Sequence, residues 1–179
     1  SMTNAIRLSE IENGNSLDWP TNMNWNSKDE LYVWFDKYIM KNVNLLTDCR
    51  QAKDKRCEIP LNSEYTNDSI AAIYIFSDGS YVNIIPGGGA TEGLERQFHL
   101  RYDINGNKSP NKQGKDIFSF RFVNGQINCD DHNTVTSTSV SQKTDRKKLI
   151  ESCKQSPKTC TCLIMKDSWR IKKDYPIVL

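Results

Sequence analysis

The clearest helical pattern in the chain lies near its N-terminus. Ser27 has the character of a helix N-cap, and Glu30, three residues further on, completes a capping box. Apolar Leu31, Phe35 and Tyr38 then recur at the spacing that places side chains on one face of a helix. We therefore predict an amphipathic helix over residues 27–46, and we expect its aromatic side chains to pack in the core rather than to form a ligand platform.

Beyond residue 69 the spacing of apolar residues changes to that of β-strands. Residues 70–76 are apolar and 81–85 are largely so, and the Ser-Asp-Gly-Ser sequence at 77–80 is typical of a hairpin turn. Residues 98–104 and 117–123 alternate between apolar and polar positions. This alternation indicates antiparallel strands with one buried face.

The remaining C-terminal residues predict shorter elements. We interpret 124–144 as a polar loop, 145–153 as a short helix, and 160–165 with 169–171 as a last hairpin. These elements together predict an α+β fold, in which an N-terminal helix packs on an antiparallel β-sheet and a disulfide-closed region follows. The length of 179 residues favours a single domain, residues 1–179, with the sheet and the C-terminal disulfide region over 70–176.

Six cysteines bear on the compartment in which the protein works. Their spacings do not match a zinc site, and the chain has only two histidines, so we interpret them as disulfides formed outside the cytosol. Local pairs are the simplest choice among several open pairings. We predict Cys49–Cys57 and Cys153–Cys160, which leaves Cys129 with Cys162.

The N-terminal segment does not account for export by itself. Ile6, Leu8 and Ile11 lie loosely on one side of residues 3–12, as at the end of a longer helix, and a turn-rich stretch follows. The sequence contains neither a signal peptide nor an apolar run near 18 residues. We therefore expect a missing hydrophobic N-terminal helix, with residues 1–26 as the end of that truncated helix plus a linker.

Charge excludes one class of partner. The net charge is +2, with lysine and arginine scattered along the chain, so we expect no nucleic-acid partner. The densest group of cations, residues 146–148, is interpreted as a solvated helix face.

The segment between the two alternating strands contains a candidate metal site. Asp103, Asn105 and Asn107 place oxygen atoms at the spacing that opens a calcium loop, and Asp116 adds a second carboxylate. No glutamate occupies the twelfth position, and Asn and Gly are also ordinary residues of tight turns. Two interpretations of this segment therefore remain: a calcium site and a purely structural turn. The residues concerned are Asp103, Asn105, Asn107 and Asp116.

Catalytic residues are not evident, and we expect no enzymatic activity. His99 lies on the polar face of a predicted strand, and His132 lies in a polar loop beside Asp130 and Asp131. Neither histidine is accompanied by a serine or cysteine in a recognisable nucleophile motif.

The C-terminal two-fifths of the chain resembles a known family. Its pattern begins with an Asp-Ile-Asn-Gly stretch (Asp103–Gly106), a Pro-Asn pair (Pro110, Asn111) and a Lys-Asp-Ile-Phe-Ser-Phe strand (Lys115–Phe120). It closes with a Cys-rich segment that contains Trp and Asp-Tyr-Pro, namely Cys153, Cys160–Ile164, Asp167–Ile171 and Asp174–Pro176. This pattern is similar to that of type IV pilin-like proteins and pseudopilins. Two departures are Ser168, where the pattern usually has glycine, and the extra cysteine Cys162.

The resemblance implies a function as well as a fold. It implies a subunit of a type IV pilus or type II secretion-like filament, as a major, minor or pseudopilin, with other such subunits as partners. It also implies an inner-membrane anchor through the missing N-terminal helix and a final place on the cell surface or in the periplasm. The alternative function is a secreted or surface-exposed binding module, adhesin- or lectin-like and calcium-dependent. A small secreted hydrolase is a weaker third candidate.

Overall fold

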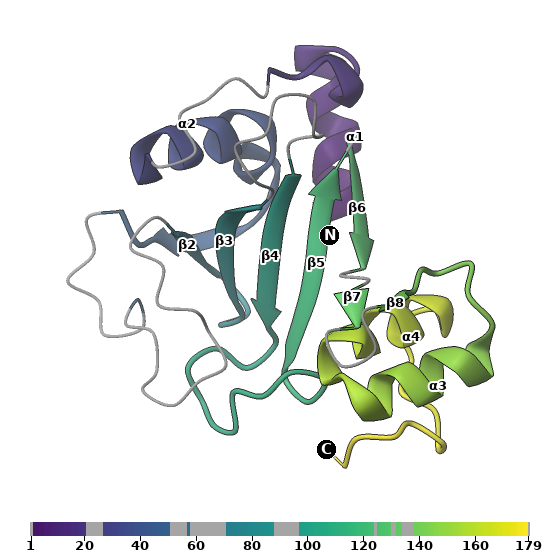
Figure 1. The fold of residues 1–179 in the computed structure, drawn as a ribbon. Coiled ribbons are helices and arrows are strands. Elements are labelled where there is room, and N and C mark those ends of the chain that lie inside the picture. The colour runs from purple at the N-terminus through teal and green to yellow at the C-terminus, as the bar shows by residue number, and fades with distance from the viewer. Residues whose placement is uncertain are drawn as a thin grey trace.

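A six-stranded antiparallel sheet forms the centre of the computed structural model, which describes residues 2–20, 27–50, 57, 71–87, 97–123, 125–129, 132–133 and 138–178 (Figure 1). The strands lie side by side in chain order. They are β1 (Leu45–Asp48), β2 (Ala72–Phe76), β3 (Tyr81–Gly87), β4 (Gln97–Asp103), β5 (Ile117–Val123) and β6 (Gln126–Cys129). The α+β class and the antiparallel sheet are therefore as predicted.

One face of this sheet carries the main core. Cross-strand pairing aligns Ala72, Ile84, Leu100 and Phe120 in one row on this face. All four side chains are buried in the same hydrophobic cluster. The alternation read from residues 98–104 and 117–123 thus follows directly from the pleat of two half-buried strands.

Two helices cover that face, α1 (Met2–Asn13) and α2 (Lys28–Tyr38). Ser27 caps α2 as predicted, because its side chain accepts a hydrogen bond from the Glu30 backbone N–H at 3.3 Å. The hydroxyl of Tyr32 accepts from the Ile73 N–H at 2.9 Å and donates to the Ile73 carbonyl at 3.2 Å. This pair of bonds ties α2 to β2, and burial raises the pKa of the Tyr32 phenol to about 12.

The predicted end of this helix is wrong. We expected it to continue to residue 46, but α2 ends at Tyr38, a 3₁₀ turn covers Met40–Asn42, and residues 45–48 form β1. Asn42 and Asn44 are poor helix formers, and the apolar residues at 45 and 46 fit either period. Pairing with β2 satisfies the backbone of this segment, so tertiary contact decided its state.

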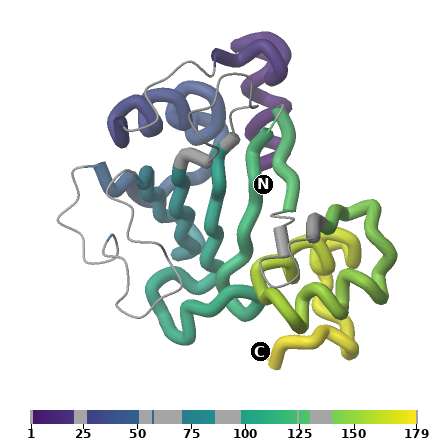
Figure 2. Tube along the Cα trace, viewed as in Figure 1, coloured from purple at the N-terminus to yellow at the C-terminus, as the bar shows by residue number. Residues whose placement is uncertain are grey.

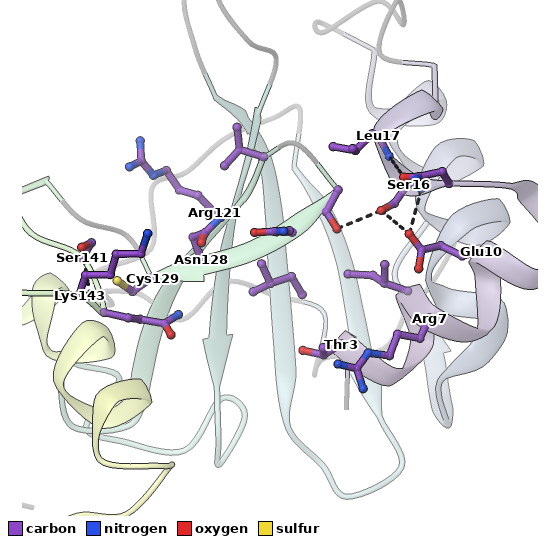
Figure 3. A pocket seen from close by; sticks show the side chains of 17 residues that line it. Thr3, Arg7, Glu10, Ser16, Leu17, Arg121, Asn128, Cys129, Ser141 and Lys143 are labelled. Atoms are coloured by element: carbon purple, nitrogen blue, oxygen red, sulfur yellow. Dashed lines mark hydrogen bonds between the residues drawn. The ribbon is translucent and has the colours of Figure 1, made fainter.

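A close contact joins α1 to the far edge of the sheet (Figure 3). Glu10 accepts hydrogen bonds from the backbone N–H of Ser16 at 3.0 Å and from its hydroxyl at 2.6 Å. The same hydroxyl lies 3.3 Å from the carbonyl oxygen of Gly125, just before β6. A Cβ at Gly125 would lie 2.3 Å from Ser16 Oγ, so this contact requires glycine.

The C-terminal region is helical where we predicted a hairpin. It contains α3 (Arg146–Gln155), which matches the short helix predicted at 145–153, the 3₁₀ turn Pro157–Thr159, and α4 (Cys160–Lys166). Residues 160–164 are all buried, so they show no period that separates a helix from a strand. The predicted loop 124–144 also contains β6 and a small hairpin of β7 (His132–Asn133) and β8 (Thr138–Ser139).

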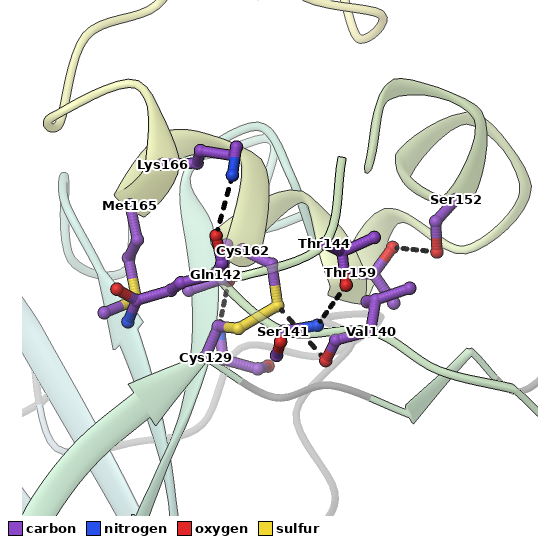
Figure 4. Close-up of a disulfide and its surroundings, with 12 residues drawn as sticks. Cys129, Val140, Ser141, Gln142, Thr144, Ser152, Thr159, Cys162, Met165 and Lys166 are labelled. Carbon is purple, nitrogen blue, oxygen red and sulfur yellow. Dashed lines mark hydrogen bonds between the residues drawn. A yellow bond between two sulfur atoms is a disulfide. The ribbon is translucent and has the colours of Figure 1, made fainter. Parts of the chain in front are cut away.

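All three predicted disulfides are present, namely Cys49–Cys57, Cys129–Cys162 and Cys153–Cys160. The bond between Cys129 and Cys162 joins β6 to α4, beside Val140 (Figure 4). The N-terminal and C-terminal helices lie at different ends of the sheet (Figure 2), so this bond connects the C-terminal helices to the rest of the fold.

A charged network adds to this connection. Arg146 at the start of α3 donates to Asp167 at 2.8 Å and to Asp174 at 2.6 Å, and Lys172 donates to Asp167 at 2.8 Å. The prediction that residues 146–148 form a solvated face is therefore wrong for Arg146, whose guanidinium bridges two carboxylates. Arg146 holds the chain after α4 against the start of α3.

The turn that ends α4 contains a strained residue. Ser168 has φ +57° and follows the last helical turn, where the Trp169 N–H bonds back to the Ile164 carbonyl at 2.8 Å. This is the geometry of a helix C-cap that normally uses glycine, because a Cβ is unfavourable at positive φ. The departure from the pilin-like pattern at Ser168 therefore falls at a position where the backbone favours glycine.

We predict that Ser168→Gly stabilises the protein by about 0.5–1 kcal/mol, because it removes the Cβ from the left-handed conformation. Urea denaturation measures the change. Ser168→Ala is the control: it keeps the Cβ and removes only the hydroxyl, so it is expected to give no gain. A gain of equal size in both variants would contradict the backbone explanation.

Acid is expected to weaken the C-terminal network. Hydrogen bonds from Arg146 lower the pKa of Asp167 from 3.8 to about 2. A lowered folded-state pKa contributes stability above the unfolded pKa, and this contribution is lost as the pH falls from about 4 to about 2. After a discount for the partly exposed Arg146, we predict that Asp167→Asn costs about 1–2 kcal/mol at neutral pH.

The variant should also show a flatter dependence of unfolding free energy on pH between about 4 and 2 than the parent protein. Asp18→Asn, which removes an exposed carboxylate outside the network, is the matched control. An unchanged acid slope in Asp167→Asn would refute the assignment.

Candidate functional site

The polar loop between β4 and β5 is the candidate site. It begins at Asp103, whose side chain is fully buried at the end of β4. Asp103 Oδ1 accepts a hydrogen bond from the Asn105 N–H at 3.0 Å, which starts the turn. Gly106 continues it at φ +67°, and a Cβ there would lie 2.6 Å from the Gly79 carbonyl oxygen. The loop therefore packs directly on the neighbouring β2–β3 turn.

Two asparagine amides meet at the Asp103 carboxylate. One terminal atom of the Asn105 amide lies 2.8 Å from Asp103 Oδ1, and one terminal atom of the Asn111 amide lies 2.9 Å from Asp103 Oδ2. Each of these atoms also lies within 3.2 Å of the Gly106 and Lys108 carbonyl oxygens. We call these groups the oxygen cluster: the Asp103 carboxylate, the Asn105 and Asn111 amides, and the Gly106 and Lys108 carbonyls.

The orientation of the amides determines what this cluster can do. If the amide nitrogens face inward, they donate to the carboxylate and to both carbonyls, and the loop is satisfied without an ion. If the amide oxygens face inward, oxygen atoms crowd together and repel one another unless a cation lies between them. Carboxylate, amide and carbonyl oxygens are the ligands that calcium prefers.

Asp116 stabilises the loop through hydrogen bonds to its backbone. Its carboxylate accepts from the Asn111 N–H at 2.9 Å and the Lys112 N–H at 2.6 Å, so it holds the backbone of the residue that carries the second amide. Asn105 Nδ2 donates to Asp116 Oδ2 at 3.4 Å, in the orientation that turns Asn105 Oδ1 toward Asp103. Asp116 is thus a positioning residue.

The structure brings together part of the predicted calcium set. Asp103 and Asn105 belong to the oxygen cluster, Asp116 positions it, and Asn107 lies half-buried in the same turn. The prediction did not include Asn111 or the two backbone carbonyls. Asn111 is buried at φ +52°, a conformation that asparagine tolerates better than most residues, and the Pro-Asn pair was the available signal for it.

Other candidate chemistry lies apart from this loop. His99 is half-buried on β4, and Asp130 and Asp131 lie outside the described residues. Among the residues that the structure describes, no three or more His, Cys, Asp or Glu side chains are grouped so as to hold a metal ion. Any cation in the oxygen cluster would therefore depend on one carboxylate and neutral oxygens, which is typical of weak, extracellular calcium sites.

Comparisons with known proteins assign a family. A model described as a family of unknown function (DUF6613) matches residues 1–179, and the chain belongs to that family. No curated protein and no solved structure matches the chain. Across the described part of the chain, no helix has the length and apolar character needed to cross a membrane.

We predict weak calcium binding in the oxygen cluster, with a Kd of about 1 mM, as in extracellular modules. At about 10 mM calcium the melting temperature should rise by about 3–5 °C. Asn111→Asp should enlarge this shift, because it adds a second carboxylate to the cluster, and Asp103→Asn should abolish it.

Ser109→Asp is the matched control, since it adds the same charge to the same loop at an exposed position outside the oxygen cluster. Thermal unfolding with calcium, and with magnesium at the same concentration, measures the effect. No calcium shift in either the parent protein or Asn111→Asp would exclude the site, and an equal gain in both aspartate variants would show attraction by loop charge alone.

Proposed function

We propose that this member of a family of unknown function is a structural subunit of an extracellular filament of the type IV pilin-like kind. The observation that carries the proposal is the exposed apolar face of α1. Ala5 and Ile6 of α1 are buried on the sheet, whereas Leu8 and Ile11 are 51% and 80% exposed. Leu8 and Ile11 are three residues apart and therefore lie on one side of the helix.

An N-terminal helix with two apolar faces suits a subunit that packs on its own sheet and on neighbouring helices. Single exposed apolar residues are common on protein surfaces, but Leu8 and Ile11 form a pair on one side of α1. The helical periodicity of α1 also allows it to be the end of a longer helix.

Two further features support the proposal. Three disulfides indicate an oxidising compartment, outside the cytosol, where such filaments assemble. Two residues that carry the pilin-like resemblance also lie at constrained positions: Gly106 has positive φ, and Asp116 accepts hydrogen bonds from the loop backbone.

A calcium-dependent binding module is the second candidate, because the oxygen cluster offers carboxylate, carbonyl and amide oxygens to a hard cation when both amide oxygens face inward. The coding sequence upstream of Thr3 distinguishes the two. A Gly followed by Phe-Thr-Leu-x-Glu and about 20 apolar residues supports a filament subunit. A conventional cleaved signal peptide supports the secreted module and refutes the filament proposal.

We predict that Leu8→Glu with Ile11→Glu removes the protein from sheared surface filaments of its source cell, because a charged face cannot pack against neighbouring helices. The fold should persist, with an unchanged melting temperature of the isolated chain, since both side chains are exposed. Immunoblots of sheared and cell fractions measure the distribution.

Val33→Glu is the matched control, because Val33 is 63% exposed on α2. It should reach the sheared fraction like the parent protein. The proposal fails if the parent protein is absent from sheared filaments, or if the α1 variant is incorporated as well as the control.

A further inference from the structure

A groove surrounds the last strand of the sheet. β6 is the terminal strand in the order β1 to β6, and a pocket of about 880 Å³ lies along it between α1 and residues 141–143 (Figure 3). This volume lies within the range of about 300–1,000 Å³ that is typical of ligand pockets.

The lining residues come from both faces of the sheet. Arg121 of β5 pairs with Asn128 of β6, so these two residues point to one face. Ile127 points to the other face, where the groove is lined by Ile6 and Arg7 of α1. The groove therefore follows the strand edge itself, where an added strand would form its hydrogen bonds.

Positive charge dominates the walls. Arg7, Arg121 and Lys143 line the groove, and Arg7 and Lys143 are exposed. Among the described residues of the lining, Glu10 is the one carboxylate, and it accepts hydrogen bonds from the N–H and hydroxyl of Ser16. The hydrogen bonds from Ser16 lower the pKa of Glu10, and the charge of Arg7 adds to this lowering.

We propose that this groove binds an extended acidic segment of a partner protein as an additional strand beside β6. Successive side chains of a strand point to opposite faces, so acidic residues at alternate positions would face Arg7, and those between them would face Arg121. Cations at a sheet edge are known to repel unwanted strands, and the same charges select an acidic one. This inference does not depend on the filament proposal.

The length of β6 limits the affinity. The strand has four residues, so an added strand gains few backbone hydrogen bonds, and charge supplies much of the selectivity. We expect binding that is saturable, weak and reduced by salt.

The probe is a labelled, N-acetylated and C-amidated peptide of alternating Glu and Thr, measured by fluorescence anisotropy with the full 179-residue chain. A Lys-Thr peptide of equal length should not bind. The Glu-Thr peptide with N-methyl groups at alternate residues keeps its charge but loses ladder donors, so it should bind at least about tenfold more weakly.

Charge reversal on the protein tests the location. Arg7→Glu with Lys143→Glu should weaken binding at least about tenfold. Lys147→Glu with Lys148→Glu changes the charge equally at exposed positions of α3, outside the groove, and should change binding less than about twofold. Melting temperatures show that each variant is folded.

Three results would overturn the proposal: no saturable binding of the Glu-Thr peptide at low salt, equal binding of its N-methylated form, or equal weakening by the two charge-reversal pairs. The second result would identify a general attraction for polyanions. The third would identify an effect of net charge. Incorporation of the α1 variant into filaments, which would refute the filament proposal, leaves these outcomes unchanged, so the two proposals fail separately.

Discussion

The fold depends on a layer of aromatic rings between the sheet and the N-terminal helices. Trp34 of α2 lies at its centre, with ring centroids 4.9 Å from Phe98, 5.5 Å from Phe122 and 5.9 Å from Trp19. Trp19 follows α1 and stacks on Tyr38 at 4.7 Å. One layer therefore holds the chain after α1, helix α2 and strands β4 and β5 together, and aromatic burial of this extent supplies a large share of the hydrophobic stabilisation.

The C-terminal region is held in a different way. Its own hydrophobic cluster is small and consists largely of cysteines, with Leu149 and Leu163 as the fully buried aliphatic residues. The Cys129–Cys162 bond and the Arg146 bridges provide the connections that a larger core would otherwise supply. This construction suits an oxidising compartment and explains how the region accommodates a strained residue such as Ser168.

The two sites with functional potential lie at rigid parts of the sheet. The oxygen cluster closes the turn between β4 and β5, and the groove follows β6, which pairs with β5. Both are therefore positioned by β5. Binding residues on a short loop or an edge strand are placed accurately when the strands that carry them are fixed by a packed core. The exposed face of α1 is a third surface, and Ser16 with Gly125 connects α1 to β6.

The sequence by itself predicted strands at 70–76, 81–85, 98–104 and 117–123, the start of α2 and the two local disulfides, because period, capping and short cysteine spacing are local signals. The Cys129–Cys162 bond spans 33 residues and followed only as the remaining pair. The sequence also located the polar loop around Asp103. Only the tertiary structure decided that residues 45–48 pair as a strand and that 160–166 form a helix, since apolar runs satisfy either state until they meet a neighbour. The spacing of residues alone could not predict the oxygen cluster. Asn111 and two backbone carbonyls lie close to Asp103 because the Asp116 carboxylate binds the Asn111 backbone and holds the loop in its turn.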